Sequence, residues 1–370
     1  MLLLDSLPNS ISTDYPWVSS PLIVSAPMAK VAMPKLAVAV SKAGGLGFIA
    51  AGYHSDHLED LLEEAEDLLQ EGQTDTPVEE TANGVPTFLH VGVGFITWSA
   101  SLEKALPSFA RYCPAAVWLF APPNGFQDLI PWTTTIREAT ASRTKIWVQV
   151  GSVSDAVKVV NTIDPDVIVV QGLDAGGHSL ARGASIVSLV PEITDTLRQL
   201  RRPYHPQKKR AHVVAAGGIS DGRGVVAALA LGAEGCVLGT RFLASPESMV
   251  AHGYQRAILD ASDGGVSTVR TTIYDKVRDI HGWPAGYDGR GLINRTYLDH
   301  LAGLSEVKNR ELYREALNQG DIGYGPQGRL TTYAGTGVGL IREIMSAGDI
   351  VKSMREGARK ILNGQLQAKL

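Results

Sequence analysis

The sequence predicts a (β/α)8 TIM barrel with a mostly helical C-terminal cap inserted before its closing helix. Eight short apolar runs alternate with helical patterns between residue 22 and about residue 240. Glycine-rich turns follow the last two of these runs, and the alternation stops after residue 246. The number of strands alone leaves an open doubly wound sheet as the alternative architecture.

The eight predicted strands are rich in Val, Ile and Ala. Most are apolar on both faces, as expected for strands buried in a parallel sheet. Short apolar runs bounded by turn residues favour strands over helices at these lengths. The predicted strands are Leu22–Met28, Leu46–Ala51, Thr87–Phe95, Ala115–Ala121, Lys145–Val150, Val167–Gln171, His212–Ala216 and Gly235–Leu238.

The segments between the strands contain amphipathic helical patterns. From Leu58 to Leu69, leucine and alanine recur with i, i+3, i+4, i+7 spacing, and acidic residues occupy the other face. Residues 152–162 and 221–232 also predict helices, and Ser220 and Asp221 are candidate N-caps of the latter.

The C-terminal third has a different composition. Residues 247–332 are polar and aromatic and show no clear strands, whereas a closing helix is predicted at roughly residues 338–363. We therefore expect three parts. Residues 1–246 would form the barrel with its binding site, 247–332 a helical cap and substrate region, and 333–370 the closing helix and tail. Such a cap would hang over the C-terminal face of the barrel, where barrel active sites lie.

Composition narrows the classes of function. Of 370 residues, 44% are hydrophobic and 19% charged, so a large core is feasible. A net charge of −4 gives no general attraction to nucleic acid or to an anionic membrane. The sequence shows no secretory signal pattern or long apolar stretch, which predicts a cytoplasmic protein. Its two cysteines, Cys113 and Cys236, form no disulfide framework or zinc pattern. Nothing indicates the oligomeric state.

Two glycine turns predict a phosphate site. Gly217, Gly218 and Ile219 follow the seventh predicted strand, and Gly239 and Thr240 follow the eighth. Glycine turns at adjacent strand ends bring backbone N–H groups together without obstruction, and a helix N-terminus adds partial positive charge. Thr240 adds a hydroxyl donor. The alternative is that the glycines only permit tight turns, but the pairing after the last two barrel strands favours phosphate binding.

The segment after the sixth predicted strand contains a candidate general base. Gln171 ends that strand, and a loop containing Gly176 and Gly177 then presents His178. A histidine there can serve as a base near neutral pH, and Gln171 suits the polar edge of a flavin or nucleobase. The alternative is a loop histidine without a role.

Other positions are more ambiguous. Pro27, Met28 and Ala29 end the first predicted strand and could offer a flat surface to a ring, although Met28 could equally be a core residue. His54 and His57 have a spacing that suggests a metal. They lack an accompanying ligand pattern, so solvated loop residues are the favoured interpretation, and no metal is predicted.

At these positions the sequence resembles the nitronate monooxygenase family, long called 2-nitropropane dioxygenases. Ala-Gly-Gly-His, Gly-Gly-Ile and Gly-Thr-Arg-Phe occur in the family's order. The matching stretches are residues 26–29, 43–48, 175–178, 215–219, 231–233 and 239–242. The resemblance implies a TIM barrel with one noncovalent FMN. The residues expected to bind it are Pro27, Met28, Ala29, Gln171, Gly176, Gly177, Gly217, Gly218, Ile219, Gly239 and Thr240.

The resemblance also implies an activity. His178 would remove the α-proton of a neutral nitroalkane, or steady the anionic nitronate. The flavin would oxidise the nitronate, and O2 would complete the conversion to a carbonyl compound and nitrite. Two alternatives stay open: an NAD(P)H-dependent FMN reductase acting on quinones or enoyl thioesters, and a flavin-binding protein without turnover. The segment containing Tyr333, Ala334 and Gly335 aligns only loosely with the family.

Overall fold

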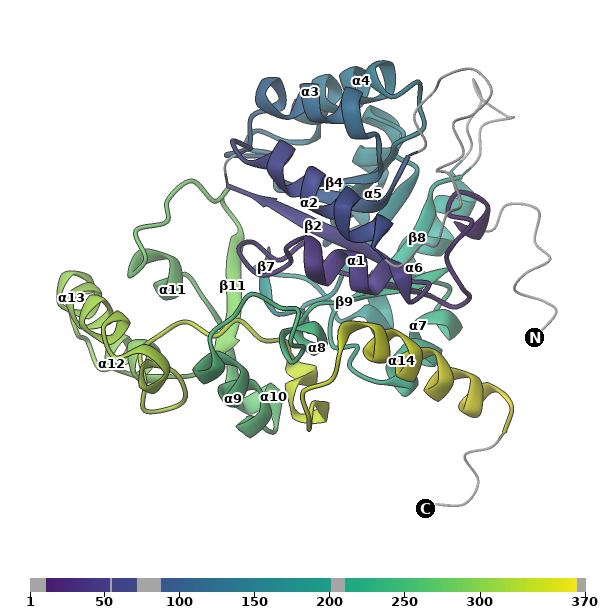
Figure 1. Cartoon of the computed structure of the whole chain (residues 1–370). Coiled ribbons are helices and arrows are strands. Elements are labelled where there is room, and N and C mark those ends of the chain that lie inside the picture. Colours follow the sequence, from purple (N-terminus) through teal and green to yellow (C-terminus); the bar gives the residue numbers. More distant parts are fainter. Residues whose placement is uncertain (1–10, 54, 72–87, 201–209, 365–370) are drawn as a thin grey trace.

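The computed structural model describes residues 11–53, 55–71, 88–200 and 210–364. Eight parallel strands close into a barrel in the order β1-β2-β3-β4-β5-β6-β8-β9, and β1 pairs with β9 to complete it (Figure 1). The predicted TIM barrel is therefore confirmed, and the open sheet is excluded. The strands are β1 Leu22–Ser25, β2 Leu46–Gly52, β3 Leu89–Ile96, β4 Pro114–Phe120, β5 Lys145–Val150, β6 Val167–Gln171, β8 His212–Ala216 and β9 Gly235–Leu238.

The predicted strand bounds agree with the structure for β5, β6, β8 and β9. The first strand ends at Ser25 rather than at Met28, because Pro27 has no N–H group with which to continue the ladder. The N–H of Ala26 still donates to the carbonyl of Leu238, at 3.0 Å. The predicted start of the third strand at Thr87 lies outside the described residues.

Aromatic side chains fill the barrel interior. The Phe48 ring lies edge-on to that of Trp118, with centroids 5.3 Å apart, and Trp147 Nε1 donates to the Tyr15 hydroxyl at 2.7 Å. A Cβ atom at Gly92 would lie 2.3 Å from the Phe48 ring, so this position must be glycine for the ring to fit. The barrel is thus a packed core, with its open site at one end.

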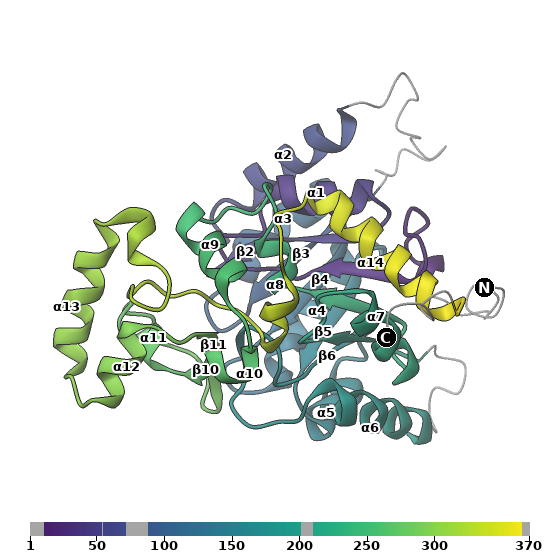
Figure 2. The same ribbon diagram turned by 90° about the horizontal axis from the view of Figure 1, so that it is seen from below.

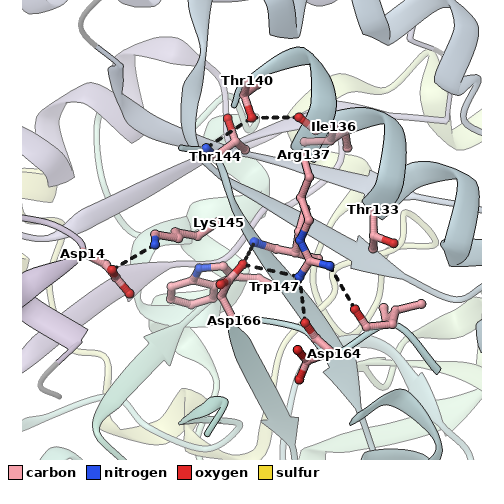
Figure 3. Close-up of polar contacts among 12 residues, drawn as sticks. Asp14, Thr133, Ile136, Arg137, Thr140, Thr144, Lys145, Trp147, Asp164 and Asp166 are labelled. Carbon is pink, nitrogen blue, oxygen red and sulfur yellow. Dashed lines mark hydrogen bonds and ion pairs between the residues drawn. The ribbon is translucent and has the colours of Figure 1, made fainter. Parts of the chain in front are cut away.

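Polar contacts tie the strand beginnings together at the opposite end (Figure 3). Lys145 Nζ lies 3.0 Å from Asp14 Oδ1, and the Asp166 carboxylate accepts from the Ile146 N–H at 2.7 Å. Arg137 donates to two backbone carbonyls of the turn before β6. Contacts at this end of a barrel stabilise the fold, since the chemistry lies at the other end.

Helices surround the barrel. The final helix, α14, packs against α7 and α1 and closes the ring (Figure 2). It begins at Ala347 instead of near residue 338, because residues 336–340 form a short 3-10 turn. The outer helices are α1 Pro34–Lys42, α2 Leu58–Gln70, α3 Leu102–Tyr112, α4 Leu129–Ala139, α5 Val153–Thr162, α6 Ile186–Gln199, α7 Gly222–Ala230 and α14 Ala347–Leu362.

Residues 247–332, here called the cap, follow the short helix α8 (Thr240–Leu243) and lie to one side of the barrel (Figure 1). The cap helices are α9 His252–Asp260, α10 Gly264–Ser267, α11 Ile273–Lys276, α12 Arg295–Leu301 and α13 Glu306–Leu317.

The expectation that residues 247–332 contain no strands is wrong. β10 (Thr268–Thr271) pairs antiparallel with β11 (Tyr287–Leu292). The segment after β6, predicted as a loop, contains β7 (Gly177–Leu180), which pairs with the other edge of β11. A small three-stranded sheet therefore joins the barrel to the cap. Its strands are short and polar, so they lack the apolar pattern from which the barrel strands were predicted.

Candidate active site

A cavity of about 490 Å³ lies at the carboxyl ends of the barrel strands and extends under the cap. This is the face at which barrel enzymes place their active sites. The fold brings together every site residue predicted from the sequence, since all of them line this cavity: Pro27, Met28, Ala29, Gln171, Gly176, Gly177, His178, Gly217, Gly218, Ile219, Gly239 and Thr240.

The two glycine turns meet as expected. Gly217 and Gly218 have φ of 117° and 73°, values that favour glycine. Gly239 has φ of −108°, so its backbone does not require glycine. A Cβ atom there would lie 3.7 Å from the Met28 sulfur, an ordinary contact distance. Within the described part of the chain, the N–H groups of these three glycines donate no hydrogen bond. The cavity wall therefore carries unpaired donors suited to an anion.

The helix termini near these turns differ from the expectation. Asp221 is the N-cap of α7, as predicted, and its carboxylate accepts from the N–H groups of Arg223 and Gly224. The positive end of α7 is thus largely occupied by its own cap. Ser220, the other candidate N-cap, lines the cavity instead.

A segment that sequence reasoning missed crosses the glycine turns. Residues 333–340, here called the return segment, lead from the cap back toward α14. The Gly335 N–H donates to Thr240 Oγ1 at 2.9 Å, which leaves the Thr240 hydroxyl hydrogen free to donate. Thr336 donates to Asp174 through both its N–H and its hydroxyl. Gly335 and Gly337 line the cavity. Their spacing in Ala-Gly-Thr-Gly is the feature of the sequence from which this segment could have been found.

The wall formed by Pro27 and Met28 is set by a close approach of the segment after β1 to β3. A Cβ atom at Gly94 would lie 2.3 Å from the Pro27 ring, so glycine at this position lets Pro27 sit against β3. Met28 lines the cavity and also packs against the barrel core, so both interpretations of this side chain hold.

Gln171 is oriented by a chain of hydrogen bonds across three strands. Trp118 Nε1 donates to Gln149 Oε1 at 3.1 Å, and Gln149 Nε2 donates to Gln171 Oε1 at 2.5 Å. The Gln171 oxygen is therefore occupied, which leaves its NH2 group as a donor for a ligand. Trp118 and Gln149 also line the cavity. Sequence reasoning missed them, although Gln149 is the one uncharged polar residue in the β5 segment.

His178 is held much more firmly than the predicted flexible loop implies. It lies on β7, opposite Gly289 of β11, and 9% of its side chain is exposed. Its Nε2 atom lies 2.8 Å from Asp275 Oδ2. Its ring stacks on Trp283, with centroids 3.8 Å apart and planes inclined by 9°, and meets Tyr333 edge-on at 5.3 Å. None of these three neighbours was predicted.

Further polar groups face the same end of the cavity. Burial raises the pKa of Tyr53 to about 12, so its phenol is a hydrogen-bond donor at neutral pH. Arg278 lines the cavity and donates to the Tyr333 hydroxyl at 3.3 Å. Among the described residues, no carboxylate forms an ion pair with Arg278 within 4.0 Å. Its positive charge is therefore available to an anionic ligand.

His57, one of the two histidines considered as metal ligands, is not among the residues that line this cavity. The His57 side chain is 84% exposed and lies 3.6 Å from Asp60, in the solvated position favoured from the sequence. His54 lies outside the described residues. Among the residues that the structure describes, no three His, Cys, Asp or Glu side chains cluster as metal ligands would. No helix in that part of the chain is both long and apolar enough to cross a membrane.

Comparisons with known proteins agree on one family. A nitronate monooxygenase family model matches residues 15–79 and 128–357. The nitronate monooxygenase npaC of Metarhizium robertsii is 44% identical over 363 residues, covering 98% of this chain and 97% of the relative. A nitronate monooxygenase of Neurospora crassa is 41% identical, covering 95% and 93%.

Solved structures share the fold over nearly the whole chain. FabK from Thermotoga maritima has a TM-score of 0.68 at 26% identity, covering 97% of this chain and 99% of its own. A nitroalkane oxidase from Streptomyces ansochromogenes has a TM-score of 0.69 at 24% identity, covering 95% and 99%. At this identity, the similarity to the nitroalkane oxidase supports a shared fold and nothing about activity.

Proposed function

Because the chain belongs to the nitronate monooxygenase family, we propose that it oxidises nitronates, and nitroalkanes that it first deprotonates, with O2 through a noncovalent FMN. The main observation in favour of this proposal is the position of His178. Its imidazole is buried and oriented, and it lines the same cavity as the two glycine turns. The products would be a carbonyl compound and nitrite. A cytoplasmic location is part of the same proposal.

The cavity fits FMN in three respects. Gly217, Gly218 and Gly239 offer unpaired N–H groups, and Thr240 offers a hydroxyl, to a phosphate. Gln171 presents its NH2 group to the polar edge of the ring. The volume of about 490 Å³ lies within the roughly 300–1,000 Å³ typical of cofactor sites. When bound there, FMN would supply the redox chemistry that no side chain can provide.

The protein's own residues would handle the proton and the charge. His178 would accept the α-proton of a neutral nitroalkane, and the carbanion's charge would spread onto the nitro group. Arg278 and Tyr53 line the same cavity, and their donor groups would stabilise the resulting anion. The stacked Trp283 and the nearby Tyr333 keep water from the imidazole on one side.

Anaerobic stopped-flow mixing of the purified yellow protein tests the proposal. A nitronate should reduce the flavin rapidly, whereas NADH should reduce it slowly or not at all. The reverse result would establish the reductase alternative. Failure of both donors would favour a flavin-binding protein without turnover.

Replacing His178 tests the assigned base. The His178→Asn variant should lose roughly 10²- to 10⁴-fold in kcat/KM for a neutral nitroalkane, the usual contribution of a general base. It should lose much less with a nitronate prepared in advance, because that substrate has already given up its proton. Equal losses on the two substrates would contradict the role.

A further inference from the structure

Asp275, from the cap, contacts the proposed base directly. Its Oδ2 atom lies 2.8 Å from His178 Nε2, and the two side chains are 6% and 9% exposed. The residues are 97 positions apart in the chain. A buried carboxylate needs hydrogen-bond donors to offset its loss of water, so both oxygens of Asp275 require a donor.

The other carboxylate oxygen is bound by a directional chain of donors. Arg278, which can only donate, bonds to the Tyr333 oxygen at 3.3 Å, and the Tyr333 hydroxyl donates to Asp275 Oδ1 at 3.1 Å. Burial, with the charge of Asp275, raises the pKa of Tyr333 well above its usual range, which keeps this hydroxyl protonated. Since a carboxylate only accepts, the nitrogen facing Oδ2 must carry a hydrogen.

The ring has little freedom to exchange its two nitrogens. It stacks on Trp283 with planes inclined by 9°, and Tyr333 lies against it edge-on. A half-turn about its bond to Cβ would place a carbon against Asp275 and break the 2.8 Å hydrogen bond. Nδ1, in contrast, has no partner among the described residues.

From this geometry we propose that Asp275 is a positioning residue that holds neutral His178 in its Nε2-protonated tautomer, so that Nδ1 is the atom that accepts the substrate proton. The proposal rests on the proposed function for its chemistry. In that step the Cα–H bond of the nitroalkane breaks and an Nδ1–H bond forms. The electron pair moves onto the nitro group to give the nitronate, and the imidazolium is left paired with Asp275.

A purely structural role for Asp275 makes different predictions. As a buried contact between the cap and β7, it would affect stability and would lower activity toward all substrates alike. A positioning role affects only the step that needs a free Nδ1 lone pair.

The Asp275→Asn variant separates the two roles. An amide NH2 group facing Nε2 would favour the Nδ1-protonated tautomer, which cannot accept the proton. We expect kcat/KM for a neutral nitroalkane to fall at least about a hundredfold, while kcat/KM for the preformed nitronate stays within about threefold. The matched control is Asp288→Asn, which breaks the ion pair with Arg270 in the same small sheet, away from the cavity lining. It should change both activities by the same factor.

Nitrogen NMR of the wild-type protein labelled with 15N-histidine tests the tautomer without turnover or a new variant. The signal of His178 is identified as the one lost in His178→Asn. A proton on Nε2 is expected, and a proton on Nδ1 overturns the proposal. So does an equal loss of Asp275→Asn on both substrates. If nitronate fails to reduce the wild-type flavin, the proposed function fails, whereas the NMR result still decides the tautomer.

Discussion

Replacing Gly218 by alanine should weaken FMN binding by an amount that the structure allows one to estimate. Gly218 has φ of +73°, a region that costs other residues about 1–2 kcal/mol. The new Cβ atom would lie 3.1 Å from Cβ of Asp174, which Thr336 holds in place through two hydrogen bonds. The free turn can relax, but phosphate binding requires the observed conformation. Because about 1.4 kcal/mol corresponds to a tenfold change, the Kd for FMN should rise roughly 5- to 30-fold.

The assay is a titration of apoprotein with FMN, followed by flavin fluorescence. The control is Gly303→Ala, in the turn between α12 and α13. Gly303 has φ of +88° and open space around its Cβ position, so it shares the backbone cost without the phosphate site. Gly303→Ala should lose thermal stability without changing the Kd for FMN, whereas Gly218→Ala should bind FMN more weakly. An unchanged Kd in Gly218→Ala, or equal weakening in both variants, would refute the assignment of the phosphate site.

Three further predictions concern protonation and packing. Burial raises the pKa of the Cys236 thiol to about 12 and also raises that of Cys113. Iodoacetamide at pH 8 should therefore label neither cysteine until urea is added. Mass spectrometry of the labelled native protein checks this. Burial likewise raises the pKa of Tyr53 and Tyr287 to about 12. The unfolded chain loses these protons near pH 10, whereas the folded chain keeps them until about pH 12. Stability to urea should therefore hold below pH 10 and decline between pH 10 and 12. Undiminished stability at pH 11 would count against these shifts. Arg355 of α14 donates to two backbone carbonyls of the turn before β2, and Arg355→Met should therefore cost about 1–3 kcal/mol in urea unfolding without changing FMN affinity.

The barrel could be predicted from the sequence because most of its strand residues are buried on both faces and so form largely apolar runs. β5, β6, β8 and β9 match their predicted bounds for this reason. The small sheet could not be predicted. Its strands are four to six residues long and carry Gly, Arg and Asp, and β7 pairs with a strand that begins more than 100 residues later. A local pattern contains no information about such a partner.

The same limit applies to the site. Gln171, His178 and the glycine turns follow barrel strands directly, so their place at the carboxyl ends followed from the predicted fold. The neighbours of His178 come from short cap segments and the return segment, whose positions depend on the pairing of β11 with β7. Among these segments, only the two glycines beside Thr336 could have been noticed in the sequence. Before the fold was known, they indicated no more than a turn.

The residues proposed to bind the cofactor and those proposed to handle the proton therefore come from different parts of the fold. The groups proposed to donate hydrogen bonds to the phosphate lie at the ends of β8 and β9, whereas Asp275, Arg278 and Trp283 come from the cap. β7 connects the two, because it leaves the barrel after β6 and carries His178 into the sheet with β11. Changes in the cap can thus alter which substrates are deprotonated while the flavin stays bound. This separation explains why a barrel prediction can point to the proposed phosphate site but cannot specify the substrate.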